Sequence, residues 1–545
     1  MLSNSYFCAD WSKTQQSKPS ILFSSSVSSE ICRMLNEQPV SIRVASGIET
    51  TESGSELVQF YKDGQCHPVW SNENIIDSQA IYLMYAIKEF AGDGLDIYNP
   101  SYNFESILEL MNFTKPDSLV KHDPIVLAQL DILLTDAYLM LGKHLYYGFV
   151  PNEVVSSIWT NARKREPINL GYNLREALYD ENVKESLNHL LPSSHGYDEL
   201  RKLMINYLRI QEAGGWKLVE PSSIDNRGFE QYALADIQER LRVEGDLAEG
   251  DDSSEGYENA LKKFQSRHGI GADGIVGIQT ISKMNIPVEE KIASIRLNME
   301  KLRWMPEENS TYISVNIPGF SLSVIDNDSV VLSMKAILGK EARQTPIFSA
   351  YMKYIVVNPY WRVPRTILRE DIIPKVQKDI RYLKKERIRI FKAGDDTGEK
   401  EVNPWSINWK QVNANTFSYI LRQDSGVKNV LGKVKFIFPN PYDIYIHDTP
   451  DKHLFEKNIR LFSSGCIRIQ EPLKLAHYLL KDDQYSYFLE LIAMGVSQNI
   501  FLPTAVKVRI DYWTVWADEE GTANFREDVY GYDRELMELL GWDKE

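Results

Sequence analysis

The 545-residue sequence predicts a multidomain α+β protein. Its length exceeds the roughly 100–200 residues of a typical domain, so several domains are expected. Apolar residues follow the helical repeat up to about residue 215, whereas short β-branched runs separated by turn residues dominate after residue 312. We therefore expect an all-α domain, then a small three-helix domain, then a mostly-β domain that carries a helical insertion.

The composition is typical of folded globular proteins, with 43% hydrophobic and 25% charged residues. A formal net charge of −15 argues against a nucleic-acid partner, because binding to phosphates requires a basic surface. The basic stretch 381–389 is best explained as a solvated helix face.

The sequence contains no run of eighteen apolar residues, so no transmembrane helix is expected. The N-terminus lacks the basic and apolar regions of a signal peptide, although a start downstream of a leader gives the same pattern.

The N-terminal part of the chain is predicted to be helical after a short lead-in. Residues 1–50 are rich in Ser, Gln and Thr and are expected to be poorly structured. Within residues 51–220, the segments 80–90 and 126–145 place apolar residues at i, i+3, i+4 and i+7, which predicts an all-α domain. Two glycines and a proline between positions 214 and 221 mark its end.

Residues 228–290 form a compact pattern of their own. The segments 232–241 and 257–268 are amphipathic and predict two helices. A glycine-rich turn at 269–277 leads to a third short helix near Thr280, whose hydroxyl can cap free amide groups. We expect a small three-helix domain here.

Residues 305–520 are expected to form the mostly-β domain. Residues 367–425 are polar with a helical pattern, and we expect them to be an insertion into this domain. Residues 521–545 are expected to be a C-terminal tail. The predicted strands are 312–317, 321–326, 330–338, 354–358, 434–438, 442–447 and 506–515.

The four cysteines contain no CxxC pair, so neither a zinc site nor a thioredoxin-type motif is expected. Cys8, Cys32 and Cys66 lie close together in the sequence, and either a Cys8–Cys32 or a Cys32–Cys66 disulfide is compatible with an oxidising compartment. Cys466 stands alone among hydroxyl residues and glycine. This setting favours a nucleophile over a structural thiol.

A candidate catalytic group surrounds Cys466. His447 ends a predicted strand, and imidazole is the side chain suited to taking a proton from a thiol near neutral pH. Gly465 allows the backbone to approach a substrate and direct amide groups at an oxyanion. Arg468 supplies a cation that can hold a thiolate or a substrate carboxylate. The pattern therefore predicts a cysteine-dependent acyltransferase or peptidase.

The order His447, then Ser463-Ser464-Gly465-Cys466-Ile467-Arg468, resembles the L,D-transpeptidase (YkuD-type) catalytic domain. Ser464 stands where many members have a second histidine, so no role of that histidine is carried over, and Asp448 stands where some members have Ser or Gly. Further matching segments are 358–364, 421–423, 432–436 and 438–440. Together these segments resemble the large, multidomain YcbB-like branch of Gram-negative bacteria.

The resemblance implies a role for each residue of the site. Cys466 is expected to be the nucleophile and His447 the general base and later the acid. The amides of Gly465 and Cys466 are expected to form the oxyanion hole, with electrostatic support from Arg468. The expected substrate-binding residues are Tyr445, Trp361, Ser464, Ser463 and Asn440.

Simpler explanations exist for several of these side chains. Core packing accounts equally well for Trp361 and Tyr445. His453 and His477 are competing bases, although an ordinary surface or core histidine is the default for both.

The expected reaction is a two-step acyl transfer that needs no metal and no cofactor. The thiolate expels the terminal D-alanine of a tetrapeptide donor stem, and the thioester then reacts with the side-chain amine of an acceptor stem to give a 3→3 cross-link. Carbapenems are the expected inhibitors. Because the substrate that the resemblance implies is peptidoglycan, a periplasmic location is expected, with cell-wall synthesis proteins as expected partners.

The remaining domains also resemble parts of this branch. Residues 228–290 resemble a peptidoglycan-binding domain through the segments 237–241, 264–269 and 273–280, either as a glycan-binding domain or as an architectural spacer. The helical region resembles the scaffold domain through the segments 57–61, 68–70, 94–95 and 214–216. The insertion 367–425 would be a capping subdomain whose mobility controls access to the site.

Two kinds of rival function remain open. An L,D-carboxypeptidase, or an enzyme that attaches a protein to the wall, would use the same acyl-enzyme and differ only in its acceptor. A non-catalytic wall-binding protein would carry a decayed site, which the intact pair of His447 and Cys466 argues against.

Overall fold

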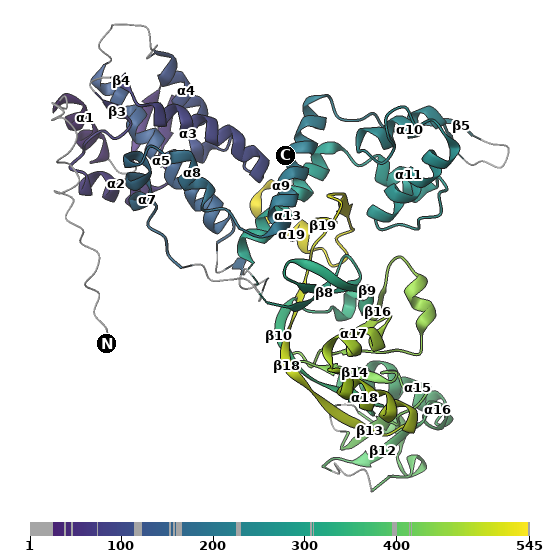
Figure 1. Ribbon diagram of the computed structural model, residues 1–545. Helices are drawn as coiled ribbons and strands as arrows, with labels where there is room; N and C mark the ends of the chain where they lie inside the picture. Colours follow the sequence, from purple (N-terminus) through teal and green to yellow (C-terminus); the bar gives the residue numbers. More distant parts are fainter. Residues whose placement is uncertain are drawn as a thin grey trace, which may run out of the picture. The chain divides into compact units, whose positions relative to one another are not determined.

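The computed structural model divides the chain into two compact units (Figure 1). One comprises residues 1–152, 164–208 and 299–304, and the other comprises residues 153–163, 209–298 and 305–545. The residues described are 25–36, 40–44, 47–72, 75–113, 123–151, 154–155, 159, 166–224, 230–305, 308, 310–394, 400–413, 415 and 417–542.

The first unit is a helical domain built around the long helix α5 (Pro124–Tyr147). The side chain of Asp123 accepts a hydrogen bond from the amide of Ile125, and Pro124 occupies the first helical turn, which together fix where the helix begins. The other helices are α1 (Ser25–Leu35), α2 (Gly54–Asp63), α3 (Ser78–Glu89), α4 (Phe104–Phe113), α7 (Leu170–Tyr179), α8 (Val183–Asn188) and α9 (His195–Glu212). The predicted helical domain is confirmed.

Helix α5 is long and apolar enough to cross a membrane by length and composition alone, contrary to the expectation from apolar runs. However, 89% of its most apolar window is buried among the other helices of the unit. That degree of burial is what the central helix of a packed helical domain shows, so the helix is weak evidence for a membrane span.

The prediction of a poorly structured lead-in is wrong for the part of it that the structure describes. Residues 25–50 form α1 and the hairpin of β1 (Ser41–Val44) and β2 (Gly47–Thr50). Val27 and Ile31 are buried in the helical core, because apolar residues recur at helical spacing within a serine-rich stretch. A disulfide joins Cys32 to Cys66, and Cys8 lies outside the described residues.

The second unit begins with a small domain of helices α10 (Leu234–Val243), α11 (Ser254–Arg267) and α12 (Ile278–Met284), as predicted. A hairpin of β5 (Pro221–Ile224) and β6 (Glu230–Tyr232) precedes it. Leu241, Leu261 and Phe264 are fully buried in its core. The next helix, α13 (Val288–Trp304), follows directly.

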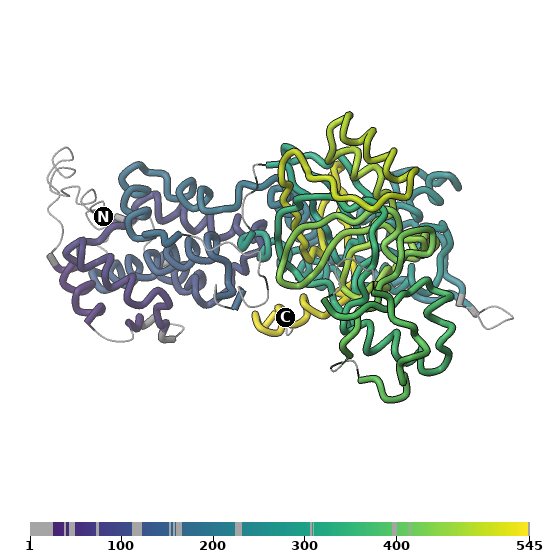
Figure 2. The backbone as a smooth tube through the Cα atoms, turned by 90° about the horizontal axis from the view of Figure 1, so that it is seen from below, coloured from purple at the N-terminus to yellow at the C-terminus, as the bar shows by residue number. Residues whose placement is uncertain are grey.

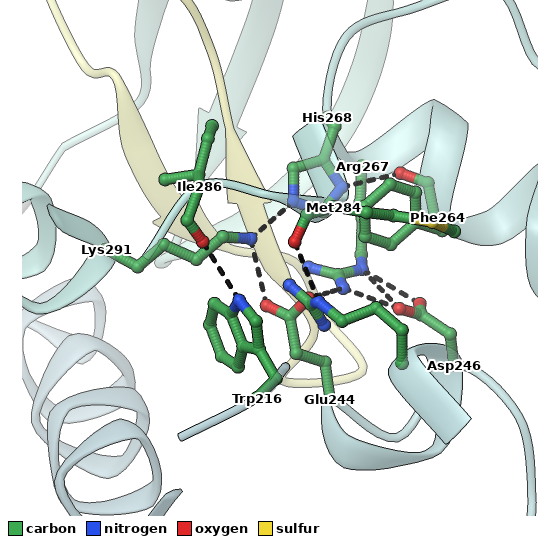
Figure 3. A network of polar contacts seen from close by, with 10 residues as sticks. Trp216, Glu244, Asp246, Phe264, Arg267, His268, Met284, Ile286 and Lys291 are labelled. Carbon is green, nitrogen blue, oxygen red and sulfur yellow. Dashed lines mark hydrogen bonds and ion pairs between the residues drawn. The ribbon is translucent and has the colours of Figure 1, made fainter. Parts of the chain in front are cut away.

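A buried charge cluster joins this small domain to α13 (Figure 3). The carboxylate of Glu244 pairs with Arg267 and Lys291, each at 2.9 Å, and Lys291 also donates to His268 Nε2 at 2.6 Å. Burial acts to raise the pKa of Glu244, but the cations around it hold that pKa well below its usual range. Because Arg267 and His268 are buried, neither can contact a glycan. His268 and Glu244 instead bind Lys291 of α13, and Arg267 pairs with Glu244.

The mostly-β part of the second unit is a sheet whose described strands run in the order β16-β9-β17-β15-β14-β10-β18-β7-β8. Strand β8 also pairs with β9, so that the sheet closes on itself. The strands are β7 (Tyr312–Asn316), β8 (Ser321–Asp326), β9 (Ser329–Gly339), β10 (Phe348–Val357), β14 (Val434–Ile437), β15 (Ile446–His447), β16 (Leu461–Ser463), β17 (Ile467–Ile469) and β18 (Gln498–Asp511). Strand β18 pairs in parallel with β7, and in Figure 2 yellow-green segments lie among teal and green ones.

Helices α17 (Pro472–Leu479) and α18 (Asp482–Met494) lie between β17 and β18 in the sequence. Pro472 occupies the first turn of α17, as expected for a helix start. The mostly-β domain with a helical contribution is therefore confirmed.

The insertion after β10 has its own core and is only half helical, which corrects the prediction. It contains α14 (Arg365–Ile367), α15 (Ile373–Lys378) and α16 (Arg381–Lys385), together with a sheet in the order β11-β13-β12. The strands are β11 (Trp361–Arg362), β12 (Ile388–Lys392) and β13 (Tyr419–Gln423). Ile388 and Ile390 are buried at strand spacing, and Arg387 and Arg389, which alternate with them, gave the segment its helical, solvated pattern.

The predicted C-terminal tail is folded. β19 (Val515–Ala517) and β20 (Ala523–Phe525) form a hairpin, and α19 (Tyr532–Leu540) follows. The hydroxyl of Tyr530 donates to the carbonyl of Gly339 at 2.5 Å and accepts from the amide of Thr345 at 3.2 Å. These contacts make the end of the chain part of the catalytic domain.

Candidate active site

All nine predicted site residues line one cavity of about 1690 Å³. These residues are Trp361, Asn440, Tyr445, His447, Ser463, Ser464, Gly465, Cys466 and Arg468. The competing histidines, His453 and His477, are not among its lining residues. The walls come from the catalytic sheet on one side and from the insertion on the other.

Strand register brings the histidine and cysteine segments together. β15 and β17 are parallel neighbours, with Ile446 opposite Ile467 and His447 opposite Arg468. The amide of Ile467 donates to the carbonyl of Tyr445 at 3.0 Å. Cys466 directly precedes β17, so it is held at the cavity end of this strand pair.

The thiol of Cys466 is half-buried and donates to the carbonyl of Asp443 at a sulfur–oxygen distance of 3.9 Å. Among the described residues, no hydrogen bond joins this sulfur to His447. Burial raises the pKa of the thiol, while Tyr445, Lys435 and Arg468 act to lower it. The thiol is therefore the favoured form, rather than the low-pKa thiolate expected of a preformed ion pair.

The imidazole of His447 is buried and points its Nδ1 at the backbone carbonyl of Asp448, 2.5 Å away. A carbonyl can only accept, so Nδ1 carries the proton and Nε2 carries the free lone pair. Burial, together with the nearby charges of Arg468 and Lys435, lowers the pKa of His447 to about 3. The ring is therefore neutral near pH 7 and can act as a base through Nε2.

Asp448 fixes the carbonyl that orients His447. Its Oδ2 accepts from the amide of Lys433 at 2.9 Å, and its Oδ1 pairs with Lys452 at 2.8 Å. Gly432 has φ +60°, and a Cβ there would lie 2.3 Å from Oδ2 of Asp448. Only glycine leaves room for this carboxylate, which the sequence analysis did not assign to the site.

The loop before Cys466 also requires glycine. Gly465 has φ +109°, and a Cβ there would lie 3.2 Å from the side chain of Ile444. Its amide donates to Ser463 Oγ at 3.1 Å, and its carbonyl accepts from Thr345 Oγ1 at 2.8 Å. This opposes the expected oxyanion role for the Gly465 amide, because that N–H is already engaged. In the described part of the chain, no hydrogen bond engages the amide of Cys466.

The predicted substrate-binding side chains have mixed surroundings. The hydroxyl of Tyr445 interacts with Cys466 and Trp361, and burial raises the pKa of Tyr445 well above its usual value. Trp361 lines the cavity and also belongs to the buried core of the insertion, so both explanations offered for it hold. Asn440 lines the cavity, but its side-chain amide donates to the carbonyls of Phe438 and Ile444 and shapes the loop between them.

Two further cations were missed by the sequence analysis. Lys435 of β14 lies opposite His447, and its ammonium is 3.7 Å from the ring centroid of Tyr445. Arg343, in the short helix η4 (Glu341–Arg343), donates to Ser464 Oγ at 2.9 Å and to Asp371 at 2.7 Å. Lys435 could have been noticed in the sequence as a charged residue within the apolar strand Val434–Ile437. Nothing near Arg343 in the sequence marks it.

The chemistry available in this cavity is that of a thiol, a neutral imidazole and cations. Within the described ranges, no group of three His, Cys, Asp or Glu side chains is arranged to hold a metal ion.

Comparison with known proteins identifies three segments. Residues 310–493 match the L,D-transpeptidase catalytic domain (YkuD), and residues 55–204 match a scaffold domain. Residues 231–284 match a family described as "Putative peptidoglycan binding domain". These matches confirm the family resemblance.

A curated relative from Haemophilus influenzae, named "Putative L,D-transpeptidase", is 32% identical over 273 residues. That alignment covers 49% of this chain and 52% of the relative, so the chain spans about half of the relative's length.

Two solved structures also match. The L,D-transpeptidase from Mycobacterium smegmatis is 10% identical, with 37% of this chain and 58% of that chain covered and a TM-score of 0.16. L,D-transpeptidase 1 of Mycobacterium tuberculosis is 13% identical, with 37% and 61% covered and a TM-score of 0.15. Scores this low support no conclusion about the fold.

Proposed function

From the L,D-transpeptidase catalytic domain that this chain carries, beside its scaffold and peptidoglycan-binding domains, we propose that it forms 3→3 cross-links between the peptide stems of peptidoglycan. The observation that supports this most directly is the placement of one thiol and one neutral imidazole in the same cavity, with Nε2 of His447 free to accept a proton.

The first half-reaction acylates Cys466. Nε2 of His447 takes the thiol proton as the sulfur attacks the carbonyl between the third and fourth residues of the donor stem. The amide of Cys466 is placed to stabilise the oxyanion. The C–N bond then breaks, and the imidazolium donates its proton to the leaving amine. D-alanine departs, and the rest of the donor stem stays bound to Cys466 as a thioester.

The second half-reaction transfers the acyl group. The side-chain amine of the acceptor stem first loses its extra proton to solvent, and its nitrogen then attacks the thioester carbonyl. Neutral His447 accepts a proton from that nitrogen as the C–N bond forms. Collapse of the tetrahedral adduct expels the thiolate, which recovers a proton from the imidazolium. The products are the cross-linked stems and the original enzyme, so no cofactor is consumed.

The resting thiol and imidazole are both neutral in this scheme. Burial raises the pKa of Cys466 and lowers that of His447, so proton transfer to form an ion pair is unfavourable before substrate binds. The proton therefore moves as the new C–S bond forms. Arg468 favours the negative charge that develops at this stage.

The insertion is proposed to act as a cap over the site. Arg343 connects its helical part to the catalytic loop, because it pairs with Glu370 and Asp371 and also donates to Ser464. Because the insertion is held by the same loop that carries Cys466, its closure over the cavity would be coupled to the position of the nucleophile.

Replacing Arg343 with alanine is expected to loosen this cap. Losing the paired contacts should lower amide-exchange protection of residues 365–378 by about fivefold, the equivalent of about 1 kcal/mol. Hydrogen exchange read by mass spectrometry measures this. The matched control is Arg369→Ala, since Arg369 also pairs with Glu370 but makes no contact with the catalytic loop. Equal protection in the two variants would contradict the proposal.

The identity of the acceptor distinguishes a cross-linking enzyme from an L,D-carboxypeptidase and from a protein-attachment enzyme. The full chain incubated with a disaccharide tetrapeptide is expected to give a dimer that has lost one D-alanine, read by liquid chromatography and mass spectrometry. An L,D-carboxypeptidase would give only the tripeptide, and a protein-attachment enzyme would need a protein lysine. A product pool with no released D-alanine would favour the non-catalytic reading.

A periplasmic location is proposed because the substrate lies outside the cytoplasm. The disulfide between Cys32 and Cys66 supports an oxidising compartment. Carbapenems, which mimic the acyl donor, are the proposed inhibitors. The buried cluster around Glu244 favours a spacer role for the peptidoglycan-binding domain over direct glycan contact by those residues.

A further inference from the structure

Lys435 places a positive charge in the cavity beside the nucleophile. It lies on β14, directly across from His447 on β15, and its side chain lines the cavity. The ammonium lies over the ring of Tyr445, 3.7 Å from the centroid, and the hydroxyl of the same tyrosine interacts with Cys466. The side chain is half-buried.

Among the described residues, no ion pair neutralises Lys435, whereas Arg468 in the same cavity pairs with Asp451 at 3.7 Å. Burial lowers the pKa of Lys435, and the negative forms of Cys466 and Asp443 act to raise it. Withdrawing an ammonium from water without a partner costs free energy, so its position fits a group that arrives with the substrate.

The donor stem supplies such a group. Its fourth residue ends in a carboxylate, and only the amide nitrogen and one Cα separate that carboxylate from the carbonyl attacked by Cys466. With standard bond lengths the carboxylate carbon lies about 4 Å from the attacked carbon. A carboxylate anchored to the reacting centre in this way falls in the same part of the cavity as Lys435.

We propose that the ammonium of Lys435 binds the terminal carboxylate of the donor stem and selects donors that end at the fourth residue. This inference rests on the proposed transpeptidase function and names a substrate-binding residue for it. The cation contributes to binding the leaving group and takes no proton in the reaction. Such an arrangement positions the scissile carbonyl for attack.

The test compares two donors that differ only at this group: a tetrapeptide stem with a free C-terminus and the same stem with a C-terminal amide. Thioester formation is followed by intact-protein mass in the full chain. The wild type is expected to acylate from the free acid about 10- to 100-fold more efficiently than from the amide, the size of one charged hydrogen bond.

Lys435→Met keeps an unbranched side chain of similar size but removes the charge and its contact with the Tyr445 ring. It is expected to lose the preference for the free acid, mainly through a higher KM for that donor, and Lys435→Arg is expected to restore much of it. The matched control is Lys353→Met, an exposed lysine on the neighbouring strand β10 that does not line the cavity, which should behave as wild type.

Four outcomes would overturn the inference. An unchanged preference in Lys435→Met would show that the carboxylate binds elsewhere. An unchanged preference together with a shifted pH profile for alkylation of Cys466 by iodoacetamide would assign Lys435 to the thiol instead. Equal acylation of the wild type by both donors would contradict the role of Lys435 but not the proposed transpeptidase function. If neither donor forms a thioester, both the role of Lys435 and the transpeptidase function are contradicted.

Discussion

Cys466→Ala is expected to abolish the covalent adduct that a carbapenem forms with the wild-type chain. The sulfur is the atom that attacks the β-lactam carbonyl, and alanine offers no nucleophile in its place. Intact-protein mass after exposure should show one added inhibitor on the wild type and none on the variant. Cross-linking of stems should vanish in parallel.

The chain offers a sharp control for this experiment. Cys32 and Cys66 are joined in a disulfide, and Cys466 is the free thiol among the described residues. Cys8→Ala should therefore acylate as the wild type does. Cys466→Ser tests the same point more finely, because its hydroxyl is a much weaker nucleophile than a thiol and should acylate far more slowly. An adduct that persists on Cys466→Ala would place the nucleophile at another residue.

All the site residues that the sequence predicted except Trp361 lie in one stretch of chain, residues 440–468. Positions 463–468 adjoin His447 because β15 and β17 are parallel neighbours. Lys435 was missed because its proximity depends on the antiparallel register of β14 with β15. Arg343 was missed because it reaches Ser464 from a loop more than a hundred residues away.

The errors about the fold share a physical cause. The lead-in and the C-terminal segment looked weak because their apolar residues are sparse, and each buries them only against elements that are distant in sequence. Tyr530 becomes ordered through the backbone of Gly339 and Thr345. The strands of the insertion were hidden because basic residues alternate with buried Ile388 and Ile390, a spacing that a helical interpretation overlooks.

The role of Asp448 could be recognised only from its contacts in the structure. In the sequence, Asp448 stands only as a difference from family members that have Ser or Gly at this position. In the structure its carboxylate is held by the amide of Lys433 and by Lys452, over a glycine at 432. Its own carbonyl then sets the tautomer of His447, which no spacing rule would reveal.

His447→Ala is expected to slow acylation of Cys466 by about 10²–10⁴-fold at neutral pH, the usual contribution of a positioned general base. The thiol would lose its proton acceptor while remaining in place. Stopped-flow measurement of β-lactam acylation gives the rate. His453→Ala and His477→Ala are the matched controls and should leave it unchanged, because neither imidazole lines the cavity.

The pH dependence of the same reaction tests whether the base is neutral at rest. The pKa of His447 is lowered to about 3, so the ring stays deprotonated as the pH falls from 8 to 5, and wild-type acylation should not decline around the ordinary histidine value. The rate should fall only as the pH approaches about 3. A decline centred near pH 6.5 would show that this imidazole titrates as an exposed one.

Removing the base should make the acylation rate depend on pH over the range in which the wild-type rate is constant. Without a base, His447→Ala can react only through the Cys466 thiolate that forms when the thiol loses its proton to water. Because burial raises the pKa of Cys466, little of this thiolate is present at neutral pH. Its acylation rate should therefore climb steadily toward alkaline pH and recover part of the lost activity there. If the variant instead shows a flat profile equal to the wild type, the proton must leave the sulfur by another route, and the assignment of His447 as the base fails.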